Sequence, residues 1–384
     1  MSSMSTPKSA RIARPGAPVI GSLDQAYTSG VNGDIGRFRL FTEGDHLYEA
    51  MLSAIGAAQS SIRLETFIFA ADEIGWQFAK ALAAKATAGV DVRFHFDAYG
   101  SATGASTDLY QYMENAGVKL KWYHLWNWWQ PTRYLQRNHR KLLVIDEQEL
   151  FLGGSNIILE NSLALSGEGR TRDTDVMVTG ELARQAAQLF DWTWDHPEKA
   201  HKQARAVRAP ERSGLYHNHM ATLHALTIGR AARCVYVTGP YFCPGSRVER
   251  ALRRSAQRGV DVRLLIPRNS DPHYVGWMTR SAYCSLINSG VRVYEYLPPR
   301  KLHAKSVVID DQSIIGSANL DHLGLFTNHE LVLVARDRRL GSELRDRFFQ
   351  DLQRSEEVQL AAWAERGLRE RLLETIGWVA RKLL

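Results

Sequence analysis

The chain has 384 residues, of which 45% are hydrophobic and 23% are charged. This composition is typical of a globular protein of two or three domains, and it excludes a largely disordered chain, a collagen-like fibre and a polytopic membrane protein. Lysine and arginine (48) outnumber aspartate and glutamate (41), so the formal net charge is +7 and favours an anionic partner such as nucleic acid, a phosphorylated molecule or an anionic bilayer.

Residues 1–30 are rich in Ser, Pro and Gly and carry three basic residues, but they contain no apolar core segment. We interpret them as a flexible basic leader and not as a secretory signal peptide. No run of 18 apolar residues occurs in the chain, so the sequence predicts no membrane-spanning helix. The three cysteines, Cys234, Cys243 and Cys284, form no CxxC pair, which favours a reducing compartment over a disulfide framework or a thiolate zinc site.

A long internal repeat dominates the rest of the chain. Residues 81–93 and 251–263 are identical at eight of thirteen positions, at a constant offset of 170. In both copies a helical pattern ends at a glycine and is followed by an apolar strand. Further strands precede and follow the two copies, at 62–69, 117–123, 234–242 and 290–296. Strands that alternate with helices in this way predict parallel βαβ units.

The repeat predicts an α/β fold of two similar halves, packed about a pseudo-twofold axis around one shared active site. We place the halves at residues 31–204 and 205–350, with a polar stretch at 205–229 as the join. Residues 351–384 are expected to form a C-terminal amphipathic helical segment. Two adjacent α/β domains that share no site are the alternative.

Each half also carries one copy of a shorter motif. Both copies read HxKxxxxD, and their defining residues are His139, Lys141 and Asp146 in the first half and His303, Lys305 and Asp310 in the second. In an extended strand, His and Lys two residues apart point to the same face. One such motif occurs by chance on many strands, but two in matching positions of a repeat indicate a functional site.

These residue types suit phosphoryl transfer without a metal. A neutral imidazole can attack phosphorus, and a second imidazole can protonate the leaving oxygen. Two lysines supply positive charge for a phosphate and its transition state. A glycine-rich turn follows each motif and ends in an asparagine, Asn156 or Asn319, whose amide adds a neutral donor. We therefore expect neither a metal nor a cofactor.

An acidic residue opens an apolar strand downstream of each motif: Asp175 before Val-Met-Val and Glu330 before Leu-Val-Leu. We hypothesise that these supporting carboxylates accept a hydrogen bond from a histidine Nδ1–H and fix the tautomer of the imidazole. The equivalence is weak, because Asp175 lies 19 residues after Asn156 whereas Glu330 lies 11 residues after Asn319. Two surface acids at strand ends are the alternative.

The paired HxKxxxxD segments resemble the phospholipase D superfamily. In more detail, the chain resembles bacterial cardiolipin synthases of the short form without N-terminal membrane spans. Supporting stretches are IRLETFIF at 62–69, DAYGS at 97–101 and GSANLD at 316–321. The resemblance covers about residues 38–349, and its motifs are more specific for the superfamily than for the synthase.

The resemblance implies a two-step mechanism through a phosphohistidine, in which one histidine attacks and the other acts as acid and then as base. It favours His139 as the nucleophile and implies phosphate contacts from the two lysines, the two asparagines and Ser317. Asp146 and Asp310 would then be structural partners of the site and not acids. The first half has Gly154 where the second has Ser317, so it lacks that hydroxyl.

Three features favour a lipid substrate. Tryptophan, which suits a bilayer interface, is concentrated just before the first motif, although a hydrophobic cover over the active site is the alternative; the cluster is Trp122, Trp126, Trp128 and Trp129. Arg133, Arg137 and Arg140 follow and suit anionic headgroups or, equally, DNA. Near the C-terminus, basic residues accompany an apolar series at helical spacing, which fits a membrane interface or docking on the protein itself; the series is Leu368, Leu372, Ile376, Val379 and Leu383.

The sequence therefore predicts a phosphatidyltransferase that makes cardiolipin, with phosphatidylglycerol as the expected substrate. Phospholipid hydrolysis is the main alternative. A nuclease of the same superfamily is less favoured because the tryptophans lack interleaved basic residues, and a non-catalytic scaffold would not need two complete motifs. We expect peripheral attachment to an anionic membrane on the cytoplasmic side, no nucleic acid partner and no obligate protein partner.

Overall fold

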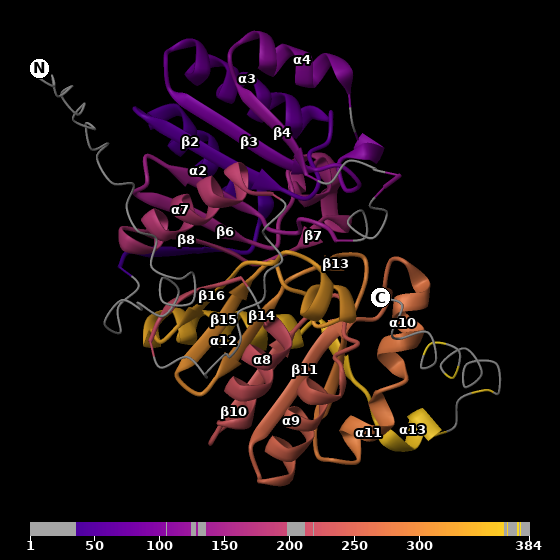
Figure 1. Ribbon diagram of the computed structural model, residues 1–384. Helices are drawn as coiled ribbons and strands as arrows, with labels where there is room; N and C mark the ends of the chain where they lie inside the picture. The colour runs from indigo at the N-terminus through magenta and orange to yellow at the C-terminus, as the bar shows by residue number, and fades with distance from the viewer. Residues whose placement is uncertain are drawn as a thin grey trace, which may run out of the picture.

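Two α/β halves lie one above the other, each built around its own β-sheet (Figure 1). The computed structural model describes residues 36–104, 106–123, 128–129, 136–197, 212–217, 219–364, 367, 375 and 377. The expected leader at 1–30 and the apolar series of the expected C-terminal helix lie outside the described residues.

The first half contains a seven-stranded sheet. Its main elements are β1 (Phe38–Phe41), α2 (Gly44–Ala57), β2 (Ser61–Thr66), α3 (Glu73–Thr87), β3 (Asp91–Asp97), α4 (Thr107–Asn115), β4 (Lys119–Tyr123), β5 (Leu142–Ile145), β6 (Glu149–Gly153), α6 (Leu163–Ser166), β7 (Thr171–Arg172), β8 (Asp175–Thr179) and α7 (Glu181–Asp195). The strand order is β1-β8-β6-β5-β2-β3-β4. Strands β2, β3 and β4 are parallel, as the repeat predicts, and the other pairings are antiparallel.

The second half contains an eight-stranded sheet. Its main elements are β9 (Gly214–Tyr216), α8 (Met220–Gly229), β10 (Cys234–Thr238), α9 (Ser246–Gln257), β11 (Asp261–Pro267), α10 (His273–Arg280), α11 (Tyr283–Ile287), β12 (Arg292–Tyr296), β13 (Lys301–Leu302), β14 (Ser306–Ile309), β15 (Gln312–Gly316), β16 (Val332–Ala335), α12 (Arg338–Leu352), β17 (Ser355–Glu357) and α13 (Leu360–Ala364). The strand order is β17-β12-β11-β10-β14-β15-β16-β9, with β10, β11 and β12 parallel.

The two sheets repeat the same central order. The series β5-β2-β3-β4 of the first half corresponds to β14-β10-β11-β12 of the second. The helices α3 and α9 carry the repeated sequence, and Gly89 and Gly259 follow them with φ of +92° and +89°. This left-handed conformation suits glycine and turns the chain from each helix into the next parallel strand. The expected α/β fold with two similar halves is confirmed.

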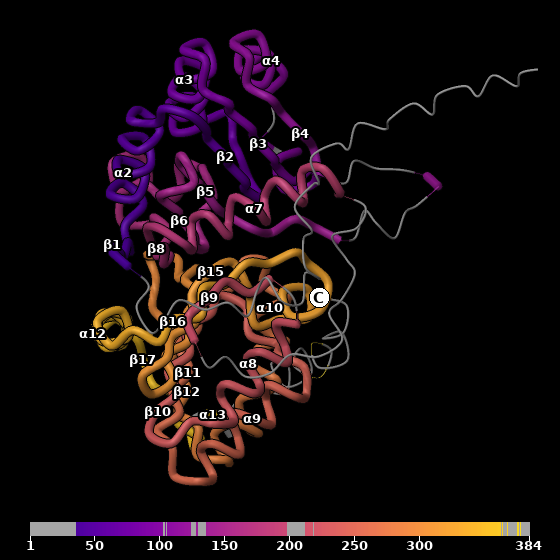
Figure 2. The backbone as a smooth tube through the Cα atoms, turned by 60° about the vertical axis from the view of Figure 1, so that its left-hand side comes forward, coloured from indigo at the N-terminus to yellow at the C-terminus, as the bar shows by residue number. Residues whose placement is uncertain are grey.

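One apolar cluster is shared between the halves. It joins Leu152 and Phe190 of the first half to Ile315, Leu333 and Phe348 of the second. Strands β6 and β8 contact β15, and Figure 2 shows β15 and β16 next to β6 and β8 at the junction. Two further clusters each belong to one half. Because burial of apolar surface is the main stabilising term in folding, the shared cluster holds the two halves together as one unit.

Two short parallel pairings cross the junction beside the motifs. Strand β7 of the first half pairs with β13 of the second, directly before His303. An isolated bridge joins Asn138 to His329, directly before His139. Each motif therefore starts from a backbone contact with the opposite half.

The second half extends past the boundary expected at residue 350. The helix α12 runs to Leu352, and β17 then pairs with β12 in the second sheet. The start of the expected helical segment at 351–384 is thus part of the second half, because β17 satisfies backbone groups at the edge of β12.

Candidate active site

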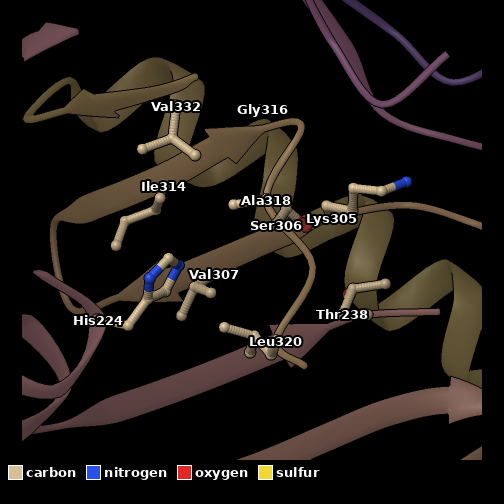
Figure 3. A pocket seen from close by; sticks show the side chains of 11 residues that line it. His224, Thr238, Lys305, Ser306, Val307, Ile314, Gly316, Ala318, Leu320 and Val332 are labelled. Carbon is tan, nitrogen blue, oxygen red and sulfur yellow. The ribbon is translucent and has the colours of Figure 1, made fainter. Parts of the chain in front are cut away.

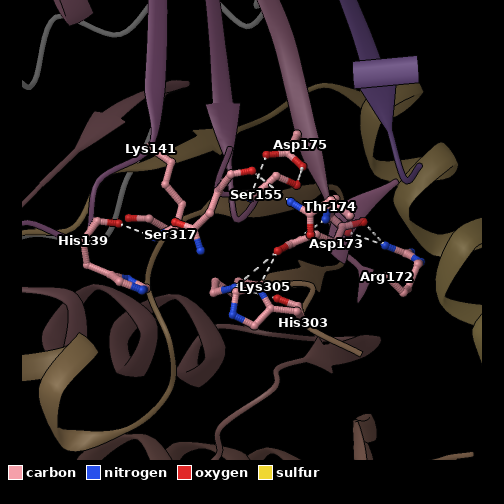
Figure 4. A network of polar contacts seen from close by, with 12 residues as sticks. His139, Lys141, Ser155, Arg172, Asp173, Thr174, Asp175, His303, Lys305 and Ser317 are labelled. Carbon is pink, nitrogen blue, oxygen red and sulfur yellow. Dashed lines mark hydrogen bonds and ion pairs between the residues drawn. The ribbon is translucent and has the colours of Figure 1, made fainter. Parts of the chain in front are cut away.

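The two motifs meet at the junction between the sheets. His139 and Lys141 directly precede β5, and His303 and Lys305 directly precede β14. Figure 4 shows these four side chains gathered in one region between the halves. Lys141 and Lys305 are buried, and the side chain of His303 is 24% exposed, so the site is nearly enclosed but still open to solvent on the His303 side.

Backbone hydrogen bonds anchor each motif histidine to the other half. The N–H of His139 donates to the carbonyl of His329 at 2.9 Å. The N–H of His303 donates to the carbonyl of Arg172 at 2.8 Å. The residue that follows each acceptor is acidic, so the same pairing delivers a carboxylate to each imidazole.

Each histidine is held by a carboxylate from the opposite half. Nδ1 of His139 lies 3.0 Å and 3.1 Å from the two carboxylate oxygens of Glu330. Nδ1 of His303 lies 2.5 Å from Oδ2 of Asp173. A carboxylate at Nδ1 fixes the tautomer and leaves Nε2 for chemistry. The hypothesis for Glu330 therefore has a matching contact in the structure, but the partner of His303 is Asp173 and not the expected Asp175.

Strand register explains why Asp173 takes this place. Gly153 pairs with Asp175 in the first sheet, and Gly316 pairs with Val332 in the second. Counting back two residues from each partner gives Asp173 and Glu330, which are therefore the equivalent pair. The sequence carries no local signal for this equivalence, because the segments between the glycine and the acid differ in length and the register follows from strand pairing.

Asp175 is a buried acid without a counterpart in the second half. It accepts hydrogen bonds from the backbone N–H and the hydroxyl of Ser155, at 3.1 Å and 2.5 Å. Burial and the neighbouring charge of Asp173 raise the pKa of Asp175 to about 7. In the second half, Val332 occupies the position of Asp175 and Ala318 that of Ser155, so this carboxyl and its hydroxyl partner occur in the first half alone.

Replacing Asp175 by asparagine should stabilise the fold increasingly as the pH rises. The pKa of Asp175 is about 7 in the folded protein and 3.8 in the unfolded chain. As the pH rises, this carboxyl therefore ionises first in the unfolded chain, and the wild type loses stability between about pH 4 and pH 7. At 1.36 kcal/mol per pKa unit, the effect is on the order of a few kcal/mol. Denaturant unfolding should show the gap between Asp175→Asn and wild type widening from pH 5 to pH 8.

Asp146→Asn is the matched control for this measurement. Backbone hydrogen bonds outweigh burial and lower the pKa of Asp146 to about 2, so this carboxyl is ionised in both states from pH 5 to pH 8. Its replacement should cost stability by an amount that does not change over that range, because the contribution of Asp146 fades only as the pH falls toward 2. A constant gap for Asp175→Asn as well would contradict the assignment of a raised pKa.

Asp146 and Asp310 lie outside the group of catalytic candidates. Each sits after the far end of its strand, with φ of 50° and 51°. Asp146 accepts from the backbone N–H groups of residues 59–61, and Asp310 accepts from those of residues 232–234. The sequence predicts both as members of the two HxKxxxxD motifs and as structural partners of the site. In the structure, their hydrogen bonds fix the turns that lead into β2 and β10.

The two lysines differ in how they contact their own histidine. Nζ of Lys141 donates to the carbonyl of His139 at 2.8 Å. Nζ of Lys305 donates to the carbonyl of His303 at 2.6 Å and lies 2.9 Å from Nδ1 of the same ring. Burial lowers the pKa of Lys141 to about 7 and also lowers the pKa of Lys305. A bound phosphate would favour the charged form of both lysines.

Only a small cavity lies behind Lys305. It measures about 10 Å³ and is lined by residues that include His224 and Thr238, as Figure 3 shows. A similar cavity of about 20 Å³ lies behind Lys141. Neither has room for more than about one water molecule. A substrate phosphate therefore does not fit into either of these two cavities.

The electrostatics of the two histidine–carboxylate pairs differ. Burial lowers the pKa of both imidazoles, and the lysine charges lower it further, so both rings favour the neutral form. Burial also raises the pKa of Glu330 to about 8. For Asp173, the charges of Lys305 and His303 outweigh burial and lower the pKa. An anionic Asp173 stabilises a protonated His303, which suits an acid and base.

Ser317 supports the site from behind. It is fully buried, donates its hydroxyl proton to Glu330 and accepts from the backbone N–H of Leu331 at 2.9 Å. The expected phosphate contact of Ser317 is therefore wrong, because its hydrogen bonds are already used. Gly154 takes its place in the first half, where an added Cβ would lie 2.1 Å from Oδ1 of Asp173. Asp173, which is shorter than Glu330, occupies the space that a serine side chain at position 154 would fill.

Asn156 is placed to donate to an anion. Oδ1 of Asn156 accepts from the backbone N–H of Ile68 at 3.1 Å, which leaves its amide nitrogen as a donor. Asn319 is buried, and its Oδ1 has no hydrogen-bond partner within the described part of the chain. Both residues directly follow the turns after β6 and β15.

A buried polar network beneath His139 was not predicted. The guanidinium of Arg140 donates to Glu65 at 2.9 Å, and the backbone N–H of Asn138 donates to Asp97 at 2.9 Å. Arg137 also contacts Asp97, at 3.4 Å. Burial alone would raise the pKa of Glu65, but Arg140 and His95 outweigh it and bring it to about 2. The network holds the segment that carries His139.

This network corrects the expected basic surface. Arg137 and Arg140 are 7% and 1% exposed and are neutralised by buried acids, so they cannot bind headgroups or DNA. Arg133 lies outside the described residues. In the second half the positions of Glu65 and Arg140 are occupied by Thr238 and Ala304, so the repeat gave no signal for these ion pairs.

The tryptophan cluster divides in the structure. Trp122 packs against Phe96, with ring centroids 4.0 Å apart, and is part of the first half's core. Trp128 and Trp129 are 81% and 92% exposed. Trp126 lies outside the described residues. Exposed tryptophan is therefore present just ahead of the first motif, although Trp122 does not contribute to it.

The site as a whole combines one imidazole that favours its neutral form, a second, His303, whose protonated form Asp173 stabilises, two buried lysines and two amide groups. One imidazole can attack a phosphorus atom while the other protonates the leaving oxygen. The lysines can stabilise the charge that builds on the phosphoryl oxygens. The arrangement is therefore competent for phosphodiester transfer within one shared site.

Comparisons with known proteins agree with this chemistry. A sequence profile described as "Cardiolipin synthase, PLD-like domain" matches residues 51–194 and 226–352. The chain is 31% identical over 360 residues to cardiolipin synthase 2 of Bacillus anthracis, covering 88% of this chain and 68% of the relative. It is 29% identical over 357 residues to a cardiolipin synthase of Clostridium perfringens, covering 88% and 75%.

Solved structures show the same fold. The phosphatidylserine synthase of Haemophilus influenzae Rd KW20 superposes with a TM-score of 0.74 at 13% identity, covering 90% of this chain and 95% of that one. A polyphosphate kinase from Porphyromonas gingivalis superposes with a TM-score of 0.61 at 15% identity, covering 91% and 54%. At these identities the likeness concerns the fold alone.

Proposed function

The chain belongs to the cardiolipin synthase family with a phospholipase D-like domain and is a phosphatidyltransferase, and from this premise we propose that it makes cardiolipin from two molecules of phosphatidylglycerol. The observation that carries the proposal is the pair of histidines at one site, each held at Nδ1 by a carboxylate of the opposite half. Such a pair supplies a nucleophile and an acid on either side of one phosphorus atom.

The reaction proceeds in two displacements. Nε2 of His139 attacks the phosphorus of the donor lipid, the bond to the headgroup glycerol breaks, and His303 protonates the leaving oxygen. His303 then takes the proton from a hydroxyl of the acceptor phosphatidylglycerol, whose oxygen attacks the phosphohistidine. The P–N bond breaks, so the sum of the two steps is cardiolipin and one glycerol. We assign attack to His139 because the resemblance to the superfamily favours the first motif.

The surrounding residues support the two steps. Lys141 and Lys305 neutralise the phosphoryl oxygens, and the amides of Asn156 and Asn319 donate to them. Asp173 stabilises the protonated form of His303, which has to give and take the same proton. No step in this scheme requires a metal or a cofactor.

Product analysis tests the proposal. Purified protein is incubated with phosphatidylglycerol vesicles, and cardiolipin, glycerol and phosphatidic acid are quantified by mass spectrometry. We expect cardiolipin and glycerol in equal amounts, with little phosphatidic acid. If the products are glycerol and phosphatidic acid without cardiolipin, the protein is a phospholipase and not a synthase. No lipid turnover together with cleavage of DNA would replace it with a nuclease.

We also propose that the protein attaches peripherally to an anionic membrane on the cytoplasmic side. Within the described residues, no helix is both long and apolar enough to cross a bilayer. Trp128 and Trp129 are highly exposed, and tryptophan is well solvated at a bilayer interface. All three cysteines are free, which supports a reducing compartment.

Vesicle binding should separate a salt-sensitive and a salt-resistant part. Attraction of a basic protein to anionic lipid is screened by salt, whereas burial of tryptophan is not. Each buried aromatic side chain contributes roughly 1.5–3 kcal/mol, so Trp128→Ala with Trp129→Ala should lower the affinity at high salt by at least about tenfold. Co-sedimentation with phosphatidylglycerol vesicles measures both parts.

Tyr112→Ala is the matched control for this experiment. Tyr112 is 42% exposed on α4 and contacts Trp76, so it is an exposed aromatic residue outside the segment that precedes the first motif. Its replacement should leave vesicle binding at high salt intact. Equal binding by the double tryptophan variant and the wild type would remove Trp128 and Trp129 from the membrane contact.

A further inference from the structure

A cavity of about 370 Å³ lies in the second half, between the end of β11 and the helix α10. Its size falls within the range of small-molecule sites, and it far exceeds the cavities behind the two catalytic lysines. Its polar lining consists of Arg268, Asn269, Ser270, His273 and Arg280, and Trp277 adds an aromatic face. The mechanism proposed above uses none of these residues.

The two arginines of the cavity are fixed in place. Nε of Arg268 and Nε of Arg280 both donate to the carboxylate of Glu295, at 3.1 Å and 3.3 Å. Glu295 is 6% exposed and also accepts from the hydroxyl of Tyr283 at 3.0 Å. A buried acid thus holds two guanidinium groups side by side. Their Nη1 atoms have no hydrogen-bond partner among the described residues, so they can still donate to a ligand.

Acids do not close the cavity to an anion. Glu295 is buried behind the guanidinium groups, and Glu356, which accepts from Nη2 of Arg268 at 2.6 Å, is 61% exposed on the edge strand β17. A solvent-exposed ion pair of this kind contributes little, so a phosphate can compete with Glu356 for Arg268. His273 is exposed and adds a third nitrogen donor to the lining.

The loop that contributes to the cavity is linked to His303 through Tyr241. The hydroxyl of Tyr241 donates to the carbonyl of Asp271, in the loop between Ser270 and α10, at 2.7 Å. The ring of the same Tyr241 meets the ring of His303 edge-on, with centroids 6.4 Å apart. Strand β11 also contacts β13, which leads directly into His303. One tyrosine therefore separates the loop of the cavity from the catalytic site.

Among the described residues of the first half, no equivalent group of cations lies at the corresponding strand end. The strand that corresponds to β11 is β3, and it ends at Asp97, an acid that binds Arg137 and Asn138 within the protein. Within the part of the chain that the structure describes, the site is therefore asymmetric, with the cationic cavity on its second-half side. A symmetric pair of histidines can in this way distinguish two substrates of the same chemical class.

Transfer between two phospholipids requires two phosphates near the site at once. One is bonded to the histidine, and the other belongs to the acceptor lipid, three carbons away from the attacking hydroxyl. The two catalytic lysines serve the reacting phosphate. We infer that the cavity of Arg268 and Arg280 binds the phosphodiester of the acceptor lipid and so selects a phospholipid over water or a simple alcohol. The inference rests on the proposed function and names the acceptor subsite of that same reaction.

A competition between two acceptors tests the subsite. The protein receives phosphatidylglycerol vesicles and 1-butanol in a phosphate-free buffer, and the ratio of cardiolipin to phosphatidylbutanol is measured. Asn269→Asp places an anion in the lining at an exposed residue that makes no hydrogen bond among the described residues, so the fold should tolerate it. We expect this variant to lower the ratio about tenfold or more. Arg280→Gln should act in the same direction.

Two further variants check the sign and the site of the effect. Glu356→Gln frees Arg268 and should raise the ratio. Arg292→Gln breaks an equivalent arginine–glutamate pair on β12 with Glu357, away from the cavity, and should leave the ratio unchanged. An unchanged ratio in both Asn269→Asp and Glu356→Gln would overturn the subsite. Absence of glycerol release from the wild type would instead overturn the proposed function, so the two failures are distinguishable.

Discussion

Replacing either His139 or His303 by alanine should lower cardiolipin synthesis by at least ~10²–10⁴-fold, the range for loss of a positioned acid or base. The structure holds each imidazole at Nδ1, by Glu330 and by Asp173, so each ring has only Nε2 available for a substrate. In the proposed mechanism one ring attacks and the other protonates the leaving glycerol, so neither can replace its partner. Steady-state turnover with phosphatidylglycerol vesicles measures both losses.

The two histidine variants should differ in the intermediate. His303→Ala retains the nucleophile and should still form some phosphohistidine, whereas His139→Ala should form none. His46→Ala is the control, because His46 is an exposed histidine on α2 outside the site. Near-normal turnover of either active-site variant would refute a single site shared by the two halves.

The second large effect is expected at the carboxylates. Asp173→Asn and Glu330→Gln keep the shape of the side chain but replace the carboxylate at Nδ1 by an amide, which can hold the imidazole in the wrong tautomer. In a catalytic triad this change costs roughly 10⁴-fold in turnover. We expect a loss of about 10²–10⁴-fold in kcat, with little change in vesicle binding.

Asp175→Asn is the matched control for Asp173→Asn. The two residues lie two positions apart and both are buried, but Asp175 bonds to Ser155 and contacts neither histidine. Its replacement should reduce turnover far less than that of Asp173. The dependence of turnover on pH distinguishes a positioning role from a structural one. Loss of the Asp173 charge should shift the low-pH side of this profile, which reflects the titration of His303, whereas a purely structural change should not. An equal loss of turnover in Asp173→Asn and Asp175→Asn would contradict the pairing of His303 with Asp173 of the opposite half.

The sequence predicted the fold and the reacting groups because both depend on local patterns. The repeat at 81–93 and 251–263 records a helix, a left-handed glycine and a parallel strand, and all three features occur in both halves. The HxK spacing puts His and Lys on one face of an extended segment whatever the surrounding fold. Two copies of that spacing in a repeat are therefore enough to predict a candidate site.

The errors arose where distant segments meet. Asp175 and Glu330 each lie at the start of an apolar strand. The pairing of β6 with β8, compared with that of β15 with β16, nevertheless makes Asp173 the residue equivalent to Glu330. Arg140 reads as a surface cation, yet Glu65, 75 positions earlier in the chain, buries it as an ion pair. Neither contact has a local signal, since each depends on strand register and on which half supplies the partner.

The central claim is that the two halves form one active site that works through a single phosphohistidine. The most direct measurement is an alkaline quench during turnover of phosphatidylglycerol labelled in its phosphate, followed by quantification of protein-bound phosphate and peptide mapping. We expect at most one acid-labile phosphate per chain, located on His139. Two phosphates per chain, one on each histidine, or turnover without any protein-bound phosphate would contradict it.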